Sequence, residues 1–428
     1  MTQPLRIALA GLGTVGVGLV KILQNQRDLI TARAGREVVL VAVSARSRSK
    51  DRGVDLSGYA WEDDPVALAR RDDIDLFVEV MGGEDGPAKA ATDAALTAGH
   101  SVVTANKAMM ARHGTALATL AEAQGAQLRF EAGVAGGIPI VKALTEGMAG
   151  NVMTRVIGVM NGTCNYILTE MEQTGGDYGD ILTDAQRLGY AEADPTFDVG
   201  GFDAAQKLAL LTATAFGTQV DYDAMEIEGI EKVTLTDIRY AMDMGYRIKL
   251  LGVASRTDTG VEQRMQPCLV PAESSLGQLE SVTNMVVLEG EGIGRTSYQG
   301  PGAGEGPTAS AVMADVVDIA RGAQVPAFGV PVAQLAAPVP AKVQTPAPYY
   351  LRLSLADQPG ALARVADALG QAHISIDRMR QTQHDQNAAP VLIVTHACQR
   401  ATLDAALVAI AALDVAKAPP VAYRIEPL

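Results

Sequence analysis

The sequence contains little cysteine and has no long apolar run. Its three cysteines, Cys164, Cys268 and Cys398, are far apart and form no CxxC pair or Cys/His cluster. This spacing indicates neither a disulfide framework nor a zinc site. No apolar run approaches the roughly 18 residues of a membrane span. A strand predicted at 5–10 also leaves no room for a signal peptide. We therefore expect a cytoplasmic protein that does not enter a membrane.

Basic residues are in the minority: 35 Lys and Arg stand against 49 Asp and Glu, for a formal net charge of -14. Nucleic acids and anionic membranes bind through cationic surfaces, so neither is expected as the main partner. Hydrophobic residues make up 48% of the chain and charged residues 20%, which is typical of a folded protein with buried cores. At roughly 100–200 residues per domain, the length predicts two to four domains.

Short β-rich runs alternate with Ala-rich helical stretches over residues 1–130, which predicts βαβ units and a parallel sheet. The strands are expected at 5–10, 37–43, 75–80 and 101–104. The middle of the chain is predicted to be α+β, with a sheet covered on one side. Its strands are expected at 152–160 and 285–288, and its helices at 165–173, 181–188 and 203–216.

A glycine-rich segment at 290–306 leads into a helix expected to begin near Thr308, which can cap it, and to end by Arg321. The proline-rich segment at 334–349 is predicted to be an extended linker. A separate C-terminal unit follows in the order βαββαβ, the ferredoxin-like plan. Its elements are expected at 350–355, 360–370, 374–380, 391–395, 401–412 and 421–425.

The first strand runs directly into Gly11-Leu12-Gly13-Thr14-Val15-Gly16, a GxGxxG motif that opens a helix. Alone the motif is weak evidence, but this strand–turn–helix context is the one that binds a dinucleotide. Gly11 permits the tight turn, Gly13 lets the backbone approach the pyrophosphate, and Gly16 lets helix and strand pack closely. The helix N-terminus offers free N–H groups to the phosphates. The simpler alternative is a glycine-rich turn without a ligand.

The loop after the second strand reads Ser44-Ala45-Arg46-Ser47-Arg48-Ser49-Lys50, without the acidic residue that binds a ribose 2′-hydroxyl. Basic residues such as Arg46 favour a 2′-phosphate, and therefore NADP over NAD. An ordinary solvated loop explains the same residues and is compatible with NAD, so both interpretations stay open.

Four carboxylates and a lysine lie within the segment 192–207. Asp203 and Lys207 are four residues apart on a predicted helix and share one face, where a surface ion pair is the simplest interpretation. The segment 185–207 nevertheless resembles, at every position, the homoserine dehydrogenase signature A-x3-G-aromatic-A-x2-D-P-x2-D-x-x-G-x-D-x3-K.

Further segments resemble the same family in the same order, so the resemblance extends over residues 7–321. They are 104–107, 130–139, 161–166 and 300–304. Two positions depart from the family pattern. Gly133 stands where Ser or Thr is frequent, and Ser44-Ala45 where an Arg-Asp pair is frequent, which bears on cofactor choice.

The resemblance implies the interconversion of L-homoserine and L-aspartate 4-semialdehyde, with hydride transfer at nicotinamide C4. It implies that Glu192 and Asp203 hold the substrate ammonium, while Asp198 supports the pocket. Thr163 and Tyr190 would position the amino-acid end. Lys107 and Lys207 remain for the hydroxyl, with Lys107 also touching the cofactor.

Lys207 is the candidate acid/base. Proton transfer by a lysine near neutral pH requires a lowered pKa, which the Lys107 ammonium and partial desolvation would promote. The family pattern also places Gly82 and Gly304 beside the cofactor.

The turn after residue 130 resembles the family's monovalent-cation site. The ligands implied for sodium are the Glu131 carboxylate and backbone oxygens around Val134, Gly136 and Ile138. A glycine-rich hinge between domains explains this turn equally well.

The opening of the C-terminal unit, 353–362, resembles that of an ACT domain, a module that binds small amino acids. Asp357 can cap the helix and meet a ligand ammonium, and Pro359, Gly360 and Ala361 form the turn beside the ligand. The family pattern then implies feedback inhibition by L-threonine in threonine, methionine and isoleucine biosynthesis, and a homodimer or homotetramer. The alternative is a domain that only folds and dimerises.

The resemblance divides the chain into a Rossmann-type NAD(P)-binding domain at 1–130, completed by 305–330, and a substrate-binding and dimerisation domain at 131–304. A linker at 331–348 and an ACT domain at 349–428 follow. Two other functions compete: an aspartate-semialdehyde-type dehydrogenase with Cys164 as nucleophile, and a non-catalytic sensor of nucleotides and amino acids.

Overall fold

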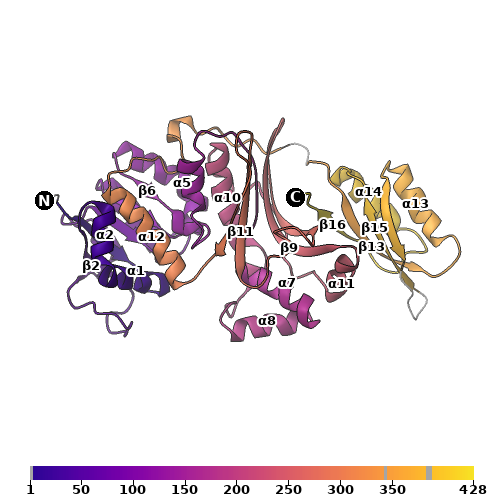
Figure 1. The fold of residues 1–428 in the computed structure, drawn as a ribbon, viewed down its shortest axis with the longest axis horizontal. Helices are drawn as coiled ribbons and strands as arrows, with labels where there is room; N and C mark the ends of the chain where they lie inside the picture. Colours follow the sequence, from indigo (N-terminus) through magenta and orange to yellow (C-terminus); the bar gives the residue numbers. More distant parts are fainter. Residues whose placement is uncertain (1–2, 342–344, 382–387) are drawn as a thin grey trace.

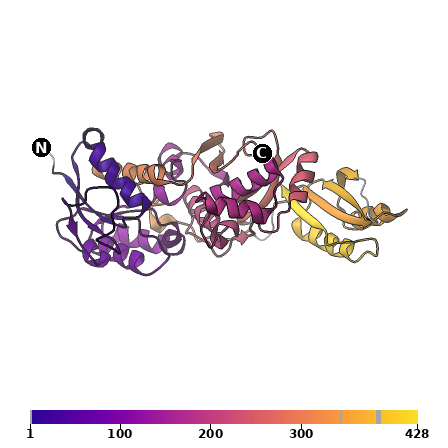
Figure 2. The same cartoon turned by 90° about the horizontal axis from the view of Figure 1, so that it is seen from below.

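The structure is a computed structural model that describes residues 3–341, 345–381 and 388–428. Three parts follow one another along the longest axis of the molecule (Figure 1). The N-terminal domain lies at one end, a central sheet with its helices comes next, and the C-terminal unit lies at the other end. The view from below shows the same elongated order (Figure 2). Within the described residues, no helix combines the length and apolarity that crossing a membrane requires.

The N-terminal domain is a parallel sheet in the order β3-β2-β1-β4-β5-β6. Its strands are β1 (Leu5–Ala10), β2 (Val38–Ser44), β3 (Ala60–Trp61), β4 (Leu76–Glu79), β5 (Ser101–Thr104) and β6 (Leu128–Arg129). This is the strand order of doubly wound dinucleotide-binding folds, with the ligand crevice between β1 and β4, where the order reverses. The predicted parallel sheet is therefore confirmed.

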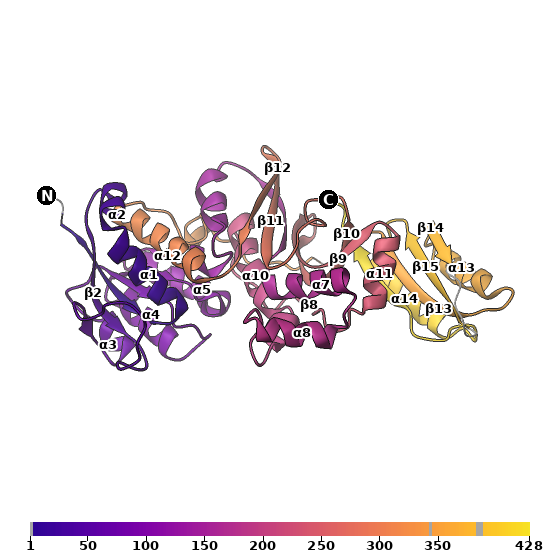
Figure 3. The same ribbon diagram turned by 60° about the horizontal axis from the view of Figure 1, so that its bottom comes forward.

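Helices cover both faces of this sheet, and one of them comes from far along the chain. They are α1 (Thr14–Asn25), α2 (Arg27–Ala34), α3 (Pro65–Ala69), α4 (Pro87–Thr97), α5 (Lys107–Ala123) and α12 (Glu305–Ala320). Figure 3 shows α12, in orange, against the indigo α1. Gly18 makes this contact possible, because a Cβ there would lie 2.8 Å from Glu305. Lys21 Nζ also lies 2.6 Å from the Glu305 carboxylate.

The predicted start of α12 near Thr308 is wrong. The helix begins at Glu305 after Gly304, and no side chain caps it. Thr308 instead lies inside the helix and donates its backbone N–H to Gly304 O at 3.1 Å. Gly304, with a φ of 117°, is the N-cap residue in place of Thr308, because glycine adopts this backbone conformation easily.

The central sheet carries helices on one face, as predicted. Its long strands are β7 (Met153–Val159), β9 (Tyr246–Thr257), β10 (Gly260–Pro271), β11 (Thr283–Gly290) and β12 (Gly294–Pro301), and β8 (Glu226–Ile227) pairs with β10. The helices are α7 (Gly162–Thr174), α8 (Tyr178–Arg187), α9 (Thr196–Val199), α10 (Phe202–Phe216) and α11 (Leu235–Asp243). Helices α7 and α10 pack against the sheet. The sequence analysis missed β9 and β10, and it took β12 for part of a glycine-rich loop.

The C-terminal unit has the predicted βαββαβ order. Its elements are β13 (Tyr349–Ala356), α13 (Ala361–Gln371), β14 (Ile376–Gln381), β15 (Ala388–Thr395), α14 (Arg400–Ala411) and β16 (Val421–Ile425). Strand β16 pairs with β13 and also, in parallel, with β10 of the central sheet. One continuous path, β12-β11-β7-β9-β10-β16-β13-β15-β14, therefore joins the two units.

A buried ion-pair network reinforces this junction. Arg264 on β10 pairs with Glu262 and, at 2.6 Å, with Glu426, just after β16. Glu426 also pairs with Arg155 on β7 and lies 3.3 Å from Arg424. Glu426 is only 1% exposed, and three arginines lower its pKa against the effect of burial. The C-terminus is thereby tied to the strand that leads into the central cleft.

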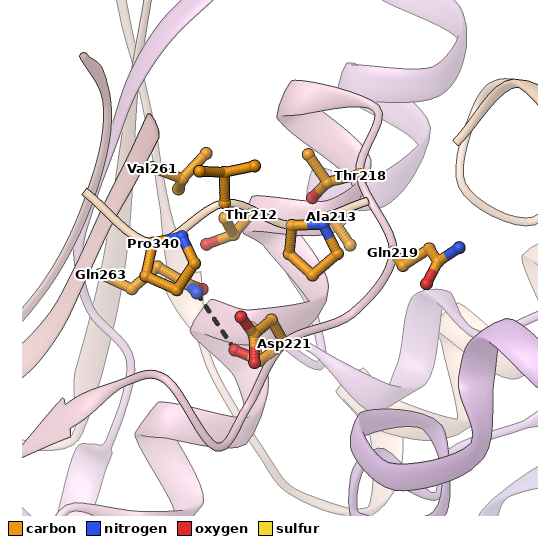
Figure 4. Close-up of a pocket in the computed structure, with 11 residues that line it drawn as sticks. Thr212, Ala213, Thr218, Gln219, Asp221, Val261, Gln263 and Pro340 are labelled. Atoms are coloured by element: carbon orange, nitrogen blue, oxygen red, sulfur yellow. Dashed lines mark hydrogen bonds between the residues drawn. The ribbon is translucent and has the colours of Figure 1, made fainter. Parts of the chain in front are cut away.

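The proline-rich segment lies along β10. Val261 donates its N–H to Val339 O at 2.8 Å, and Ala341 donates to Val261 O at 2.9 Å. A cavity of about 10 Å³, the size of one water molecule, separates this segment from α10 (Figure 4). Gln263 lines it and donates to Asp221 O at 3.1 Å, while its buried Oε1 has no partner among the described residues. Residues 342–344 of the predicted linker lie outside the described residues.

Candidate active site

A cleft of about 1380 Å³ lies between the nucleotide domain and the central sheet. All of the predicted substrate and catalytic residues line it, although they come from distant parts of the sequence. These lining residues are Lys107, Thr163, Tyr190, Glu192, Asp198, Asp203 and Lys207. Thr14, Val15, Gly82 and Gly304 line the same cleft from the nucleotide side. The structure therefore brings the predicted substrate and catalytic residues together with these predicted cofactor-binding residues.

Asp203 is the centre of the charged site. Its Oδ2 lies 2.7 Å from Lys207 Nζ, and its Oδ1 lies 3.1 Å from Lys107 Nζ. Lys207 comes from α10, as Asp203 does, whereas Lys107 is the first residue of α5 in the nucleotide domain. Lys207 also donates to Met160 O, at the end of β7, at 2.8 Å. One carboxylate thus holds two ammonium groups across the boundary between the domains.

The electrostatics follow from this arrangement. Burial alone would raise the pKa of Asp203, but the ammonium groups of Lys207 and Lys107 outweigh burial and hold it well below its ordinary value. Asp203 in turn raises the pKa of Lys107. The sequence argument for a lowered lysine pKa considered only the neighbouring ammonium and partial desolvation, and left out this carboxylate between the two lysines.

Asn161 is a site residue to which the sequence analysis assigned no role. Its side-chain amide donates to Asp198 Oδ1 at 2.8 Å and to Asp203 Oδ2 at 2.9 Å. Its Oδ1 accepts the N–H of Cys164 at 2.8 Å and so caps α7. Burial and the nearby Asp203 charge raise the pKa of Asp198. The sequence analysis began this helix at Asn165, so it missed both the capping role of Asn161 and its contacts with the two carboxylates.

The rim of the cleft carries the other predicted substrate residues. The Thr163 hydroxyl donates to Tyr190 O at 2.6 Å, which fixes the loop after α8 against α7. The Tyr190 ring packs on Tyr166, with 4.9 Å between ring centroids. Glu192 is exposed at the same rim. Its carboxylate is therefore accessible to a ligand, whereas both Asp203 oxygens already contact lysines.

A second buried carboxylate shapes the nucleotide side. Glu79, at the end of β4, accepts the N–H of Met81 at 2.7 Å and of Gly82 at 3.2 Å. Its other oxygen accepts the Thr104 hydroxyl at 2.6 Å. Asn106 caps α5 and donates to Gly83 O at 2.7 Å. These bonds fix the loop that carries Gly82 beside the start of α5, where Lys107 lies.

The glycine-rich turn has the geometry predicted for it. Gly11 has a φ of 103°, and a Cβ there would lie 2.6 Å from Val80 O, while a Cβ on Gly16 would lie 2.0 Å from Gly11 O. A Cβ on Gly13 would meet nothing within 4 Å, so the backbone is open on that side. Helix α1 starts after Gly13 without a side-chain cap, which leaves its first N–H groups free for phosphates. The turn therefore fits a dinucleotide, and Leu12 is a buried member of it.

The basic loop after β2 lies beside this turn. Arg52 donates to Leu12 O at 3.2 Å and to Ser47 O at 2.6 Å, and so holds the loop against the turn. Arg46 is exposed in the same loop. It lies just after β2, at the strand end beside which doubly wound folds hold the ribose of a dinucleotide.

The predicted cation turn is buried at the back of the cleft. Glu131 is 2% exposed and accepts the N–H groups of Val141 at 3.1 Å and Lys142 at 2.7 Å. Burial and the neighbouring Asp315 raise the pKa of Glu131 to about 7. Gly136 packs on the 300–304 segment, since a Cβ there would lie 2.7 Å from Gly302 O. Val134 and Ile138 are buried in the same turn.

The loop expected to bind a regulatory ligand lies between β13 and α13. Asp357, Pro359 and Gly360 are exposed, and Ala361 begins the helix. The prediction that Asp357 caps α13 is wrong: Gly360, with a φ of 84°, is the N-cap and no side chain caps the helix. A glycine in the left-handed conformation turns the chain here, so the Asp357 carboxylate is left without this role.

Two family models match the part of the chain that forms the cleft. "Homoserine dehydrogenase" matches residues 139–317, and "Homoserine dehydrogenase, NAD binding domain" matches residues 11–131. A homoserine dehydrogenase from Neisseria gonorrhoeae is 43% identical over 100% of this chain and 99% of its own length. The chain belongs to the homoserine dehydrogenase family. It is an oxidoreductase that interconverts L-homoserine and L-aspartate 4-semialdehyde.

Other relatives extend the match over the whole of this chain. A Bacillus subtilis homoserine dehydrogenase is 35% identical over 99% of both chains. The crystal structure of a Thiobacillus denitrificans homoserine dehydrogenase superposes with a TM-score of 0.93, at 40% identity over 99% of this chain and 98% of that one. An ACT domain model matches residues 349–414, which confirms the resemblance of the C-terminal unit.

A hyperthermophilic archaeal homoserine dehydrogenase in complex with NADPH aligns with a TM-score of 0.64 at 25% identity. It covers 74% of this chain and 97% of its own. Together with the NAD-binding match, it supports a nicotinamide cofactor in this homoserine dehydrogenase.

The competing functions are excluded by the family and by the geometry. Cys164 is fully buried, its Sγ lies 3.2 Å from Asp198 O, and burial raises its pKa well above the ordinary value. A thiol in this environment is a poor nucleophile, because the thiolate is the reactive form. A dehydrogenase mechanism through Cys164 is therefore not supported, and the family assignment replaces the sensor hypothesis.

Proposed function

We propose that Lys207 exchanges the proton with the substrate oxygen, and that Asp203 holds Lys107 and Lys207 in place for this reaction. The observation that carries the proposal is the double ion pair on one buried carboxylate, at 2.7 Å and 3.1 Å, beside the nucleotide-binding crevice. A nicotinamide cofactor held by the turn at Gly13 and by Gly304 would supply the hydride chemistry when bound. In the reduction direction, the Lys207 ammonium gives a proton to the aldehyde oxygen, and in oxidation the neutral amine takes it from the alcohol.

Lys107 then has a different task. It is partly exposed to the cleft, and Asp203 raises its pKa, so it stays protonated at neutral pH. A fixed ammonium stabilises negative charge that develops on the substrate oxygen, and it also reaches the cofactor side of the cleft. Met160 O, bound to Lys207 at 2.8 Å, keeps the ammonium of Lys207 oriented between two acceptors.

Substrate recognition is assigned to the rim of the cleft. Glu192 is exposed there and binds the homoserine ammonium, while Thr163 and Tyr190 position the amino-acid end. Asp198 supports the pocket through its bond with Asn161, at 2.8 Å. Asp203 also adds negative charge that favours the substrate ammonium. Its oxygens already contact Lys107 and Lys207, so its main proposed role is to position these two lysines.

Glu192→Gln is expected to raise the KM for homoserine by about tenfold or more, with a smaller effect on kcat. The change removes an ammonium partner and leaves the proton carrier in place. Steady-state rates with homoserine at saturating cofactor measure both constants. An unchanged KM would refute the role of Glu192, and Glu273→Gln is the matched control, since Glu273 is exposed and lies outside the cleft lining.

For the cofactor we propose a preference for NADP over NAD, with Arg46 facing the 2′-phosphate. The loop that carries Arg46 has no acidic residue before Asp51, and Arg52 holds it against the phosphate-binding turn. The solved structure of the archaeal relative is a complex with NADPH, which supports the same choice.

Arg46→Asp is expected to narrow or reverse the preference, because a carboxylate repels the 2′-phosphate and accepts a ribose 2′-hydroxyl. The ratio of kcat/KM for NADP and NAD measures this. A clear preference of the unmodified enzyme for NAD would contradict the proposal. Arg33→Asp, on α2, controls for the loss of a positive charge elsewhere in the same domain.

A monovalent cation such as sodium fits the turn around Glu131. Burial, and after it the neighbouring Asp315, raises the pKa of Glu131, although the Lys142 ammonium lies 2.9 Å from Asp315, and a cation would stabilise the charged form of this carboxylate. The Glu131 carboxylate and backbone oxygens of Val134, Gly136 and Ile138 would hold the ion. There it would rigidify the turn that contacts the 300–304 segment over the cofactor.

We propose that L-threonine inhibits the enzyme by binding at the ACT loop of Asp357, Pro359, Gly360 and Ala361, in a cytoplasmic homodimer or homotetramer. The backbone N–H of Gly360, an exposed residue of the turn, suits a carboxylate, and the Asp357 carboxylate suits an ammonium. The junction supports coupling, because Glu426 contacts Arg155 on β7, and Met160, directly after β7, binds Lys207. A ligand that binds one state of this junction more tightly than the other changes the population of the two states, and with it the position of Lys207 in the active site.

A further inference from the structure

One wall of the cleft is formed by the start of β11 and the loop before it. Val282, Thr283 and Asn284 line the cleft there. The wall lies directly against the N-terminus of α7, because a Cβ on Gly162 would lie 2.7 Å from Val282 O. Ser281, next to it, has a φ of 57°. A residue other than glycine rarely adopts this left-handed backbone conformation unless its surroundings hold it there.

Asn165 holds this loop from α7. Its side-chain amide donates to Ser281 O at 2.8 Å. The same nitrogen lies 3.4 Å from Leu279 O and 3.5 Å from Thr283 O. One amide group thus gathers the carbonyl groups on both sides of the strained residue, and it fixes the wall relative to α7.

Lys249 completes the arrangement from β9. Its Nζ donates to Asn165 Oδ1 at 3.0 Å and also to Leu279 O. Both acceptors are uncharged oxygens, and burial lowers the pKa of Lys249 to about 8. The charged groups around it, Glu172, Arg247 and Glu280, pair with one another, since Arg247 lies 3.1 Å from Glu172 and 3.4 Å from Glu280.

A buried ammonium without a carboxylate partner is costly, so its presence calls for a reason beyond packing. The reason is visible one turn away on the same helix. Asn161, four residues before Asn165, orients Asp198 and Asp203, the carboxylates of the charged site. Helix α7 therefore connects the charged site at its N-terminus with the opposite wall through Asn165.

We propose that Asn165 and Lys249 are positioning residues for the homoserine dehydrogenase reaction. They fix the wall of Val282, Thr283 and Asn284 against the N-terminus of α7 and so set the width of the cleft beside Thr163. Neither side chain lines the cleft. The inference rests on the dehydrogenase activity but not on which lysine carries the proton.

The test compares Asn165→Ala, Lys249→Met and the double variant in homoserine oxidation. Each single change is expected to raise the KM for homoserine by about tenfold while kcat falls by less than about threefold, because the chemical groups remain and only their spacing loosens. The KM of the double variant should not exceed the higher KM of the two single variants, since both changes release the same loop. Amide hydrogen exchange over 281–284 should accelerate in all three.

Two further variants separate positioning from stability. Asn165→Asp keeps an acceptor for Lys249 but loses the donor to Ser281 O, so it should raise KM as Asn165→Ala does while Tm stays close to that of the unmodified enzyme. Thr169→Val, on the same helix, removes a buried hydroxyl that donates to Asn165 O at 2.7 Å, and it should lower Tm without changing KM.

An unchanged KM in Asn165→Asp would overturn the proposal. The proposal would also be overturned if the rise of KM in the double variant equalled the product of the two single rises. A rise of KM in Thr169→Val as large as that in Asn165→Ala would overturn it as well. The roles of Glu192 and Lys207 would stand in each case, because their own variants test them.

Discussion

Lys207→Met is expected to lower kcat for homoserine oxidation by about 10²–10⁴-fold, because a positioned acid/base is lost. The change should leave the fold intact. Asp203 keeps Lys107 at 3.1 Å and Asn161 at 2.9 Å, so its buried charge remains paired. Cofactor affinity, measured by the fluorescence change of the reduced nicotinamide, should be almost unchanged, since Lys207 lies on α10, at the substrate side of the cleft.

The matched control is Lys232→Met, which removes an exposed lysine that lies 3.9 Å from Glu228. It should leave kcat unchanged. A loss of kcat below threefold in Lys207→Met would contradict the assignment of Lys207 as the proton carrier. If only Lys107→Met showed the large loss expected for Lys207→Met, the role would pass to Lys107.

Threonine is expected to inhibit the full-length enzyme, and Asp357→Ala is expected to abolish that inhibition without changing the uninhibited rate. The structure makes this variant informative. Asp357 is exposed and does not cap α13, so its removal does not weaken the helix. Coupling between such sites typically changes affinity by about 5–150-fold, which a titration of initial rates resolves.

Glu426→Gln separates binding from coupling. Glu426 lies far from the ACT loop in sequence and joins β10 to β7 through Arg264 and Arg155. Calorimetry should still show threonine binding to this variant, with weaker inhibition. If the unmodified enzyme ignores threonine and the other amino acids derived from aspartate, the regulatory proposal is wrong and the ACT domain serves assembly.

The nucleotide domain could be predicted from the sequence because its signals are local. The strand before Gly11, the glycine spacing and the helix after it all lie within one βαβ unit, and the strand order follows from that unit. Within the segment 192–207 the residues of the charged site were also found. Their partners were not, since a carbonyl such as Met160 O carries no sequence signal.

The errors have physical causes as well. Gly304 and Gly360 start their helices in conformations that only glycine adopts easily, so the capping roles given to Thr308 and Asp357 were wrong. Strand β16 pairs with β10 across more than 150 residues of sequence, as Cys268 pairs with Arg424, and no local pattern predicts such a pairing. The expected lowering of the Lys207 pKa by the Lys107 ammonium stays a prediction, and it took no account of the Asp203 carboxylate, which lies between the two ammonium groups.

Chemical rescue of Lys207→Ala by methylamine tests the central claim most directly, because the truncated side chain leaves space for the amine. The variant is assayed in homoserine oxidation at saturating cofactor, with Lys107→Ala assayed in parallel. If Lys207 is the proton carrier, methylamine should restore a saturable part of kcat in Lys207→Ala, should act through its neutral form as pH rises, and should not restore Lys107→Ala. Absence of rescue in Lys207→Ala, with rescue in Lys107→Ala, would contradict the account.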